Sequence, residues 1–319
     1  MKNHINVPPS SSGLIPWKKA MGPVKIPMTN DYLFRALLQE NNYVLKGLIC
    51  SLLHLAPSDI DSVVITNPVE LGRAPDDKAF LLDIKIFLNG QTYINLEMQV
   101  INEYNWKERS LSYLCRNFDQ LKSGEFYGSA RPVIQIGLLD FTLFPEAPEF
   151  YATYQLLNVK KYTLYSDKLR LSVLDLTRID LADEKDKLYQ TDYWAMLFKA
   201  ATWEEIKMLA QNNEYINEAA STVYQLTQEE KIRYECEARE DYYRRQRGIQ
   251  MKLEALERSE KALERSEKTL EIQRAAIEDM SAAIESHVAT IKDQNDAIKN
   301  LTSENEKLLA WARAHGYEQ

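Results

Sequence analysis

The sequence has few of the residues that build disulfide frameworks or zinc sites. Among its 319 residues, the three cysteines lie far apart and form no Cys-x-x-Cys pair. They are Cys50, Cys115 and Cys236. Free, reduced thiols are typical of cytoplasmic proteins, so we expect a cytoplasmic location. The four histidines are scattered as well, which predicts no zinc centre.

Long hydrophobic runs are also missing. No apolar run approaches the roughly 18 residues that would indicate a transmembrane helix, so no membrane partner is expected. Residues 1–27 contain five prolines and a serine cluster but no apolar signal-peptide core, and they predict a flexible N-terminal arm. The net charge is −8, whereas nucleic-acid-binding proteins are more often basic. Any DNA-binding surface would therefore have to be local.

The segment 80–100 has the most informative pattern of the N-terminal two thirds. Apolar and mostly polar residues alternate on both sides of Asn89-Gly90, which predicts a β-hairpin. The apolar residues of both strands have even numbers. The two apolar faces can therefore pack on one core only if even-numbered residues lie opposite even-numbered ones, so that the numbers of opposed residues add up to an even sum. A three-residue loop at 89–91 gives a sum of 180 and places Asp83 opposite Glu97, whereas a two-residue loop fails.

In this register Asp83, Lys85, Glu97 and Gln99 share one face. Directly opposed residues have Cβ atoms about 4.5–5.5 Å apart, so the two carboxylates converge. Carboxylates beside a lysine and an amide suit Mg²⁺, which prefers oxygen ligands and can activate water at a phosphate. The alternative is an ordinary half-buried hairpin with solvated polar residues on its outer face.

Asp83, the hairpin and Glu97-Met98-Gln99 together resemble the Asp…(Asp/Glu)-x-Lys core of PD-(D/E)XK nucleases. More narrowly, the chain resembles the Rpn-type recombination-promoting nucleases and putative transposases, where Glu-x-Gln replaces Glu-x-Lys. Three further segments, at 30–35, 109–127 and 131–140, are similar to that branch. The resemblance covers roughly residues 28–180.

The resemblance implies an α/β fold of the restriction-endonuclease-like kind, with a mixed central sheet flanked by helices. It implies a DNA endonuclease that holds Mg²⁺, or Mn²⁺, through Asp83 and Glu97 and acts in recombination or transposition. Gln99 can orient a water but supplies no charge, so our hypothesis is that Lys85 supplies the positive charge at the phosphate. The alternative function is a catalytically silent scaffold that binds DNA or a partner.

The other elements follow from periodicity and breakers. We expect a helix at 30–40 capped by Thr29, and a helix at 105–123 ended by Gly124. The core stripe expected for that second helix is Leu111, Leu114, Phe118 and Leu121. The remaining expectations are a helix at 43–55, strands at 63–65, 132–141, 149–157 and 169–176, and helices from 186 onward.

Some residues are candidates for accessory roles. Asp31 and Glu70 are candidate additional metal carboxylates, although Asp31 also suits a helix dipole and Glu70 a surface loop. A second stripe of the 105–123 helix could bind the DNA backbone, because guanidinium groups fork onto phosphates; the alternative is an exposed helix face. Its residues are Arg109, Tyr113, Arg116 and Gln120.

The tail has a heptad repeat. Every seventh residue from Ile249 to Ile298 is isoleucine or leucine, and no glycine or proline occurs from 249 to 315. This predicts a helix about 100 Å long that self-associates as a coiled coil, with a dimer favoured. The paired d position is mostly polar, so a lone charged helix is the alternative. A basic and aromatic segment at 239–247 is a candidate DNA arm. The predicted domains are thus 28–180, a helical region at 181–248, and a coiled coil at 249–315.

Overall fold

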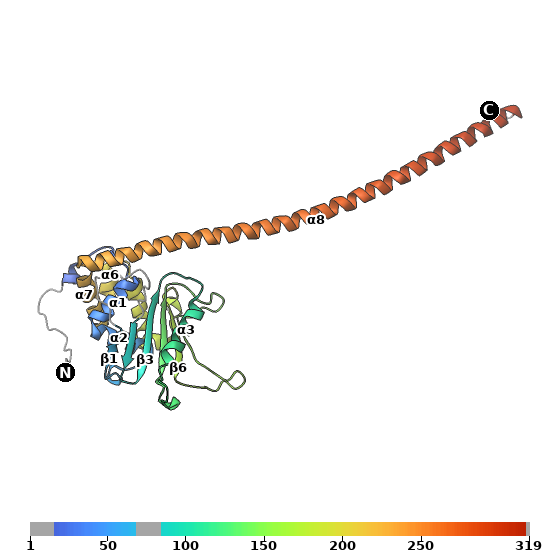
Figure 1. Cartoon of the computed structure of the whole chain (residues 1–319). Coiled ribbons are helices and arrows are strands. Elements are labelled where there is room, and N and C mark those ends of the chain that lie inside the picture. Colours follow the sequence, from blue (N-terminus) through green and yellow to red (C-terminus); the bar gives the residue numbers. More distant parts are fainter. Residues whose placement is uncertain (1–15, 68–83, 317–319) are drawn as a thin grey trace. The chain divides into compact units, whose positions relative to one another are not determined.

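The computed structural model describes residues 16–67 and 84–316 (Figure 1). The chain divides into two compact units between Arg247 and Gly248, and we describe each by itself. The division lies one residue before the start predicted for the coiled coil. The predicted boundary at residue 180 falls inside the first unit and stays a prediction.

The first unit is built on a mixed sheet of six strands in the order β1-β2-β3-β4-β6-β5. Its central strands β3, β4 and β6 are parallel, and the other pairs are antiparallel. The strands are β1 Val63–Ile65, β2 Ile84–Leu88, β3 Thr92–Gln99, β4 Val133–Leu139, β5 Tyr151–Tyr154 and β6 Leu169–Asp175. The predicted α/β class with a mixed central sheet is confirmed.

The β2–β3 hairpin has the predicted register. Ile84 pairs with Leu96 and Leu88 pairs with Thr92, so each pair sums to 180 around the three-residue loop. Asn89 and Gly90 both have positive φ, at 52° and 67°, which explains why these residue types occupy the turn. The predicted pair of Asp83 with Glu97 lies outside the described residues.

The even-numbered residues of β2, β3, β4 and β6 face the main core. Ile84, Ile86, Leu96 and Ile136 are fully buried there under α1 and α2, with α5 and α7 packed behind these helices. The helices of this layer are α1 Asp31–Glu40, α2 Asn42–Leu53, α4 Glu184–Leu188, α5 Thr191–Lys199, α6 Trp203–Ala210 and α7 Glu214–Leu226. The predicted cap of α1 was wrong by one residue, because the side chain of Asn30, not Thr29, accepts from the Leu33 N–H.

The odd-numbered face is covered by α3, Trp106–Phe118, which lies over β3, β4 and β6 (Figure 1). A side chain at Gly137 would meet the Trp106 ring at 2.1 Å, so glycine lets this helix approach the sheet. The helix ends at Phe118 rather than 123, and Gly124 lies in the turn that follows. The predicted stripe is partly wrong, because Leu111 is 54% exposed and Trp106 and Ser110 are buried instead.

Residues 16–27, which fall in the predicted flexible arm, pack on the first unit. Trp17 and Ile26 are 1% and 5% exposed, and the Val24 N–H donates to the Ala201 carbonyl at 2.8 Å. The burial of these two apolar side chains outweighs the loop-like composition. The prediction of an arm is therefore wrong for this part, and residues 1–15 lie outside the described residues.

The tail is helical as far as Ala314, and residues 315 and 316 form a turn. Helix α8, Glu230–Ala314, runs through the unit boundary, and its residues from 248 onward make up the described part of the second unit. The apolar heptad residues are exposed in the single chain, from 51% at Ile249 to 65% at Ile277. Among the described residues, no helix is long and apolar enough to cross a membrane.

Candidate functional site

The polar residues of β3 lie buried beneath α3. Asn95, Glu97 and Gln99 are 2%, 4% and 8% exposed, so a solvated outer face does not describe them. Asn95 donates its amide to the Gln135 side-chain oxygen on β4 at 2.9 Å, while the buried Asn95 Oδ1 and Gln135 Nε2 have no hydrogen-bond partner among the described residues. A carboxylate this deeply buried requires a partner, because burial of an unpaired charge is strongly unfavourable.

The partner of Glu97 is Arg109. The Arg109 guanidinium Nη2 lies 2.7 Å from Glu97 Oε1, and its Nη1 lies 3.6 Å from Glu103 Oε2. Trp106 packs on Gly137, the strand neighbour of Glu97, and Arg109 follows almost one helical turn later. The close approach of α3 to β4 therefore places the guanidinium over Glu97.

The rest of the predicted phosphate-binding stripe is spread out. The Tyr113 ring lies 5.6 Å from the Arg109 guanidinium. Arg116 is exposed on α3, and Gln120 is exposed beyond the end of the helix. Because Arg109 is engaged with Glu97, Arg116 is the exposed cation of the set.

Gln99 has one satisfied and one unsatisfied group. Its Nε2 donates to the Ile101 carbonyl at 3.0 Å, while the buried Oε1 accepts from no described residue. A buried acceptor without a donor costs about 1–3 kcal/mol. An amide oxygen beside a carboxylate fits a hard cation or its bound water.

The predicted metal pair is described only in part. Glu97 supplies an oxygen ligand of the type that Mg²⁺ prefers, while Asp83 and Glu70 lie outside the described residues. In the described ranges, no three His, Cys, Asp or Glu side chains gather as a cation site. The oxygen donors of Glu97 and Gln99 are of the type that a divalent cation prefers.

Lys85 lies on the same face of the sheet, on β2. It is exposed, and its strand partner is Asn95, two residues before Glu97. Two residues of strand span about 7 Å. A flexible lysine side chain can cover that distance, so its ammonium group can reach a phosphate bound near Glu97.

The carboxylate of Asp31, a candidate metal ligand, is instead paired with Arg239 of α8. Arg239 Nε donates to one carboxylate oxygen of Asp31 at 2.8 Å, and its Nη2 donates to the other. The pair is buried, with Asp31 6% and Arg239 8% exposed, and the Asp31 N–H donates to the Tyr243 hydroxyl at 3.4 Å. Arg239 is thus a structural residue, while Arg244, Arg245 and Arg247 of the predicted DNA arm are exposed.

A series of contacts links the Asp31 carboxylate to the Glu97 carboxylate. The Arg239 guanidinium lies 5.0 Å from the Tyr242 ring, and the Tyr242 hydroxyl interacts with Glu103. Burial, and then the Glu103 carboxylate, raise the pKa of Tyr242. Glu103 in turn shares Arg109 with Glu97. Sequence reasoning missed this connection, since no spacing pattern relates α8 to the loop after β3.

Two polar residues of the Asn30–Arg35 segment, Asn30 and Arg35, form hydrogen bonds to other elements of the first unit. The Asn30 amide donates to the Cys236 carbonyl at 3.0 Å and to Glu240 at 2.8 Å. Arg35, 1% exposed, donates to the Asn67 carbonyl, and Asn67 Oδ1 accepts from the Lys85 N–H at 2.8 Å. Helix α1 therefore joins the first turns of α8 to the start of β2.

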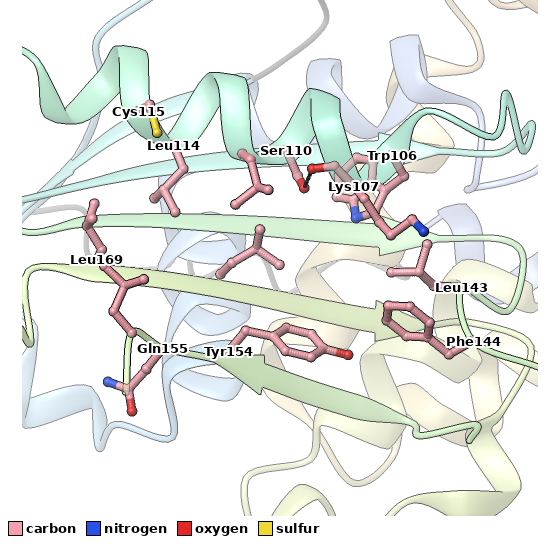
Figure 2. A pocket seen from close by; sticks show the side chains of 13 residues that line it. Trp106, Lys107, Ser110, Leu114, Cys115, Leu143, Phe144, Tyr154, Gln155 and Leu169 are labelled. Atoms are coloured by element: carbon pink, nitrogen blue, oxygen red, sulfur yellow. Dashed lines mark hydrogen bonds between the residues drawn. The ribbon is translucent and has the colours of Figure 1, made fainter. Parts of the chain in front are cut away.

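The opposite flank of α3 forms an apolar groove of about 420 Å³ (Figure 2). Trp106, Ser110 and Leu114 line it from α3, and Phe144 and Tyr154 line it from the loop after β4 and from β5. Glu97 does not line this groove, and Lys107 is its one charged lining residue. Its chemistry is therefore hydrophobic, and it is separate from the Glu97 site.

The model of a family described as PD-(D/E)XK nuclease family transposase matches residues 28–255. The match extends through β6 and the helices that follow it to the first turns of α8. No curated protein and no solved structure matched the chain.

Proposed function

Because the chain belongs to the PD-(D/E)XK nuclease family transposases, we propose that it is a Mg²⁺-dependent endonuclease that hydrolyses DNA phosphodiester bonds. Its biological setting would be recombination or transposition in the cytoplasm. The observation that carries the proposal is the family match, which includes the β2–β3 hairpin in the register that directs Glu97 and Gln99 to one face.

In this proposal Asp83 and Glu97 hold Mg²⁺, for which Mn²⁺ can substitute. The bound cation would supply a water of lowered pKa and would stabilise charge on the phosphate. Gln99 Oε1, whose orientation is set by the Nε2 donation to Ile101, would accept a hydrogen bond from the attacking water and orient it. Lys85 stabilises the phosphate oxygens, and Arg109 holds the Glu97 carboxylate in place.

Nicking of supercoiled plasmid tests the activity. Wild-type protein should nick in Mg²⁺ and not in EDTA, and Asp83→Ala and Glu97→Gln should be inactive. The matched control is Glu146→Gln, an exposed glutamate on the loop after β4, which should nick like wild type. Equal nicking by Glu97→Gln and wild type would rule out the proposed site.

Lys85→Ala tests the source of positive charge. We expect a rate loss on the order of 100-fold, as for removal of one group that stabilises transition-state charge. Lys85→Arg should keep more activity than Lys85→Ala because it keeps the charge. If Lys85→Ala cleaves as well as wild type while Asp83→Ala is inactive, Lys85 has no such role.

A catalytically silent scaffold that binds DNA or a partner is the second candidate. It is favoured by the exposed heptad residues of α8 and by the glutamine at position 99, which has no charge to offer a phosphate. DNA binding without cleavage in any divalent cation, together with clustering through the tail, would support it.

A further inference from the structure

The face of the sheet beside α3 carries an aromatic pair. Phe87 on β2 and Tyr93 on β3 are strand partners, and their rings stack with centroids 4.6 Å apart and planes inclined by 29°. Both side chains are half-buried. They have odd numbers and so lie on the same face as Lys85 and Glu97.

An exposed arginine extends this pair. The Arg131 guanidinium lies 4.9 Å from the Phe87 ring centroid and 5.9 Å from that of Tyr93, and Nη1 donates to the Tyr93 hydroxyl at 3.3 Å. The three side chains form one contiguous aromatic and cationic cluster, which we call the Phe87–Tyr93–Arg131 platform. Val64, the strand partner of Phe87, is 54% exposed beside it.

Helix α3 lies over β3, β4 and β6, whereas Phe87 lies on β2, and α1 and α2 pack on the other face. Along β3, the buried Asn95 lies between Tyr93 and Glu97, and its strand partner Lys85 is exposed on β2. Lys85 and Arg131, both exposed, give this face a local positive charge that attracts an anionic DNA backbone.

A cross-strand aromatic pair can also serve the sheet alone. Two features favour a ligand here: the arginine on the pair is exposed, and the pair lies on the same strand face as the candidate catalytic residues. Aromatic rings and arginine planes stack on nucleic-acid bases that are free of a complementary strand. Bases inside a duplex are already stacked and cannot meet such a surface.

We propose that the Phe87–Tyr93–Arg131 platform binds an unpaired base of the DNA substrate, next to the phosphate that is cleaved at Glu97. The proposal rests on the proposed function and names its substrate class, which is DNA with a single-stranded segment at the cut. Tyr93 and Glu97 are four residues apart on β3, or about 13 Å. At about 3.4 Å per stacked nucleotide, the base lies no more than about four nucleotides from the cut.

Binding in EDTA tests this without cleavage. Full-length protein is titrated into a short labelled single strand and, separately, into the matching duplex, and fluorescence anisotropy is read. Phe87→Leu and Tyr93→Leu remove flat rings but keep apolar bulk, and each should weaken single-strand binding about 5- to 150-fold. Arg131→Gln, at an exposed position that does not enter the core, should weaken it as well.

The matched control is Tyr165→Leu, an aromatic residue 84% exposed on the loop before β6, which should bind like wild type. Thermal melts establish that each variant is folded. A single abasic site stepped through the strand should reduce binding at one position, and that position should lie within about four nucleotides of the cut. Equal binding by the platform variants and wild type, or an equal loss in Tyr165→Leu, would overturn the inference.

The outcomes separate this inference from the proposed function. If wild type nicks DNA, Asp83→Ala is inactive and the platform variants bind like wild type, the nuclease proposal stands and the platform fails. If single-strand binding depends on the platform but no condition gives cleavage, the platform stands and the scaffold function replaces the nuclease.

Discussion

At the scale of single residues, Arg109 compensates the buried charge of the Glu97 carboxylate. Glu97 is 4% exposed, and its oxygen lies 2.7 Å from Arg109. Such a pair is strongly coupled, because removing one partner leaves an uncompensated buried charge. A divalent cation at the same carboxylate would perform the same neutralisation.

Arg109→Met should therefore destabilise the fold and make it more dependent on metal. We expect a loss of about 3 kcal/mol, at the low end of the range for buried pairs because the arginine side chain is partly exposed. Millimolar Mg²⁺ should raise the melting temperature of Arg109→Met more than that of wild type. In the double variant Arg109→Met/Glu97→Gln, the extra effect of Mg²⁺ should disappear. An equal Mg²⁺ effect on all three proteins would contradict this.

His54 gives the fold a dependence on pH. It ends α2 with positive φ, and its Nε2 lies 3.7 Å from Asp186 Oδ1. Burial, and then the charge of Lys185, lower the pKa of His54 below its ordinary 6.5, so burial outweighs the opposing attraction of the Asp183 carboxylate. Below about pH 6.5 the unfolded chain binds a proton that the folded chain excludes, so stability falls as pH decreases toward the folded-state pKa.

Thermal melts between about pH 7.5 and 5.5 measure this effect. His54→Asn should show a smaller drop than wild type, since asparagine tolerates the left-handed conformation but does not titrate. The control His287→Asn, at an exposed position on α8, should follow wild type. A His54→Asn profile as steep as that of wild type would assign the pH dependence to other groups.

At the scale of elements, the start of α8, up to Arg247, is part of the first unit. Arg239 binds both oxygens of Asp31 and lies against the rings of Tyr242 and Tyr243. The family match, which continues to residue 255, agrees with this. Helix α8 is therefore both the support of α1 and the beginning of the tail.

Arg239→Lys should destabilise the first unit although it keeps the charge. Lysine cannot donate in the paired geometry of a guanidinium, so we expect a loss of about 1–3 kcal/mol in urea unfolding. Arg245→Lys, an exposed position on the same helix, is the matched control and should leave stability unchanged. Equal stability of the two variants would mean that the fork to Asp31 contributes little.

At the scale of the whole molecule, the question is what covers the exposed heptad residues of α8. A symmetric dimer would present two copies of one site, as suits cleavage of both strands of a duplex. The d position is polar at Ser259, Ser266 and Gln273, so packing there should be weakest. It should be best near Ile298, Leu301 and Leu308.

Deletion of residues 249–319 should leave a folded and mostly monomeric protein. We expect it to nick plasmid but to make fewer double-strand breaks than the full-length chain, because paired sites are lost. Light scattering on both proteins gives the oligomeric state. A full-length protein that is monomeric at tens of micromolar would rule out self-association and, with it, the paired-site explanation.

The sequence by itself determined the local features. The parity of apolar residues around Asn89-Gly90 predicts the hairpin register, because side chains alternate strictly along a strand. The run from Val133 to Leu139 likewise predicts a strand buried on both faces. Each pattern depends on neighbours within a few residues.

Only the tertiary structure decided the partners of the polar residues. Asp31 meets Arg239 across 208 positions, and Glu97 meets Arg109 only because Gly137 admits Trp106 to the sheet. Neither contact produces a periodic pattern in the sequence. The basic and aromatic composition of residues 239–247 indicated DNA binding, whereas in the fold Arg239 pairs with Asp31. A charged side chain in water is solvated and needs no protein partner. Once packing buries it, it requires a partner, so its role depends on which helix covers it.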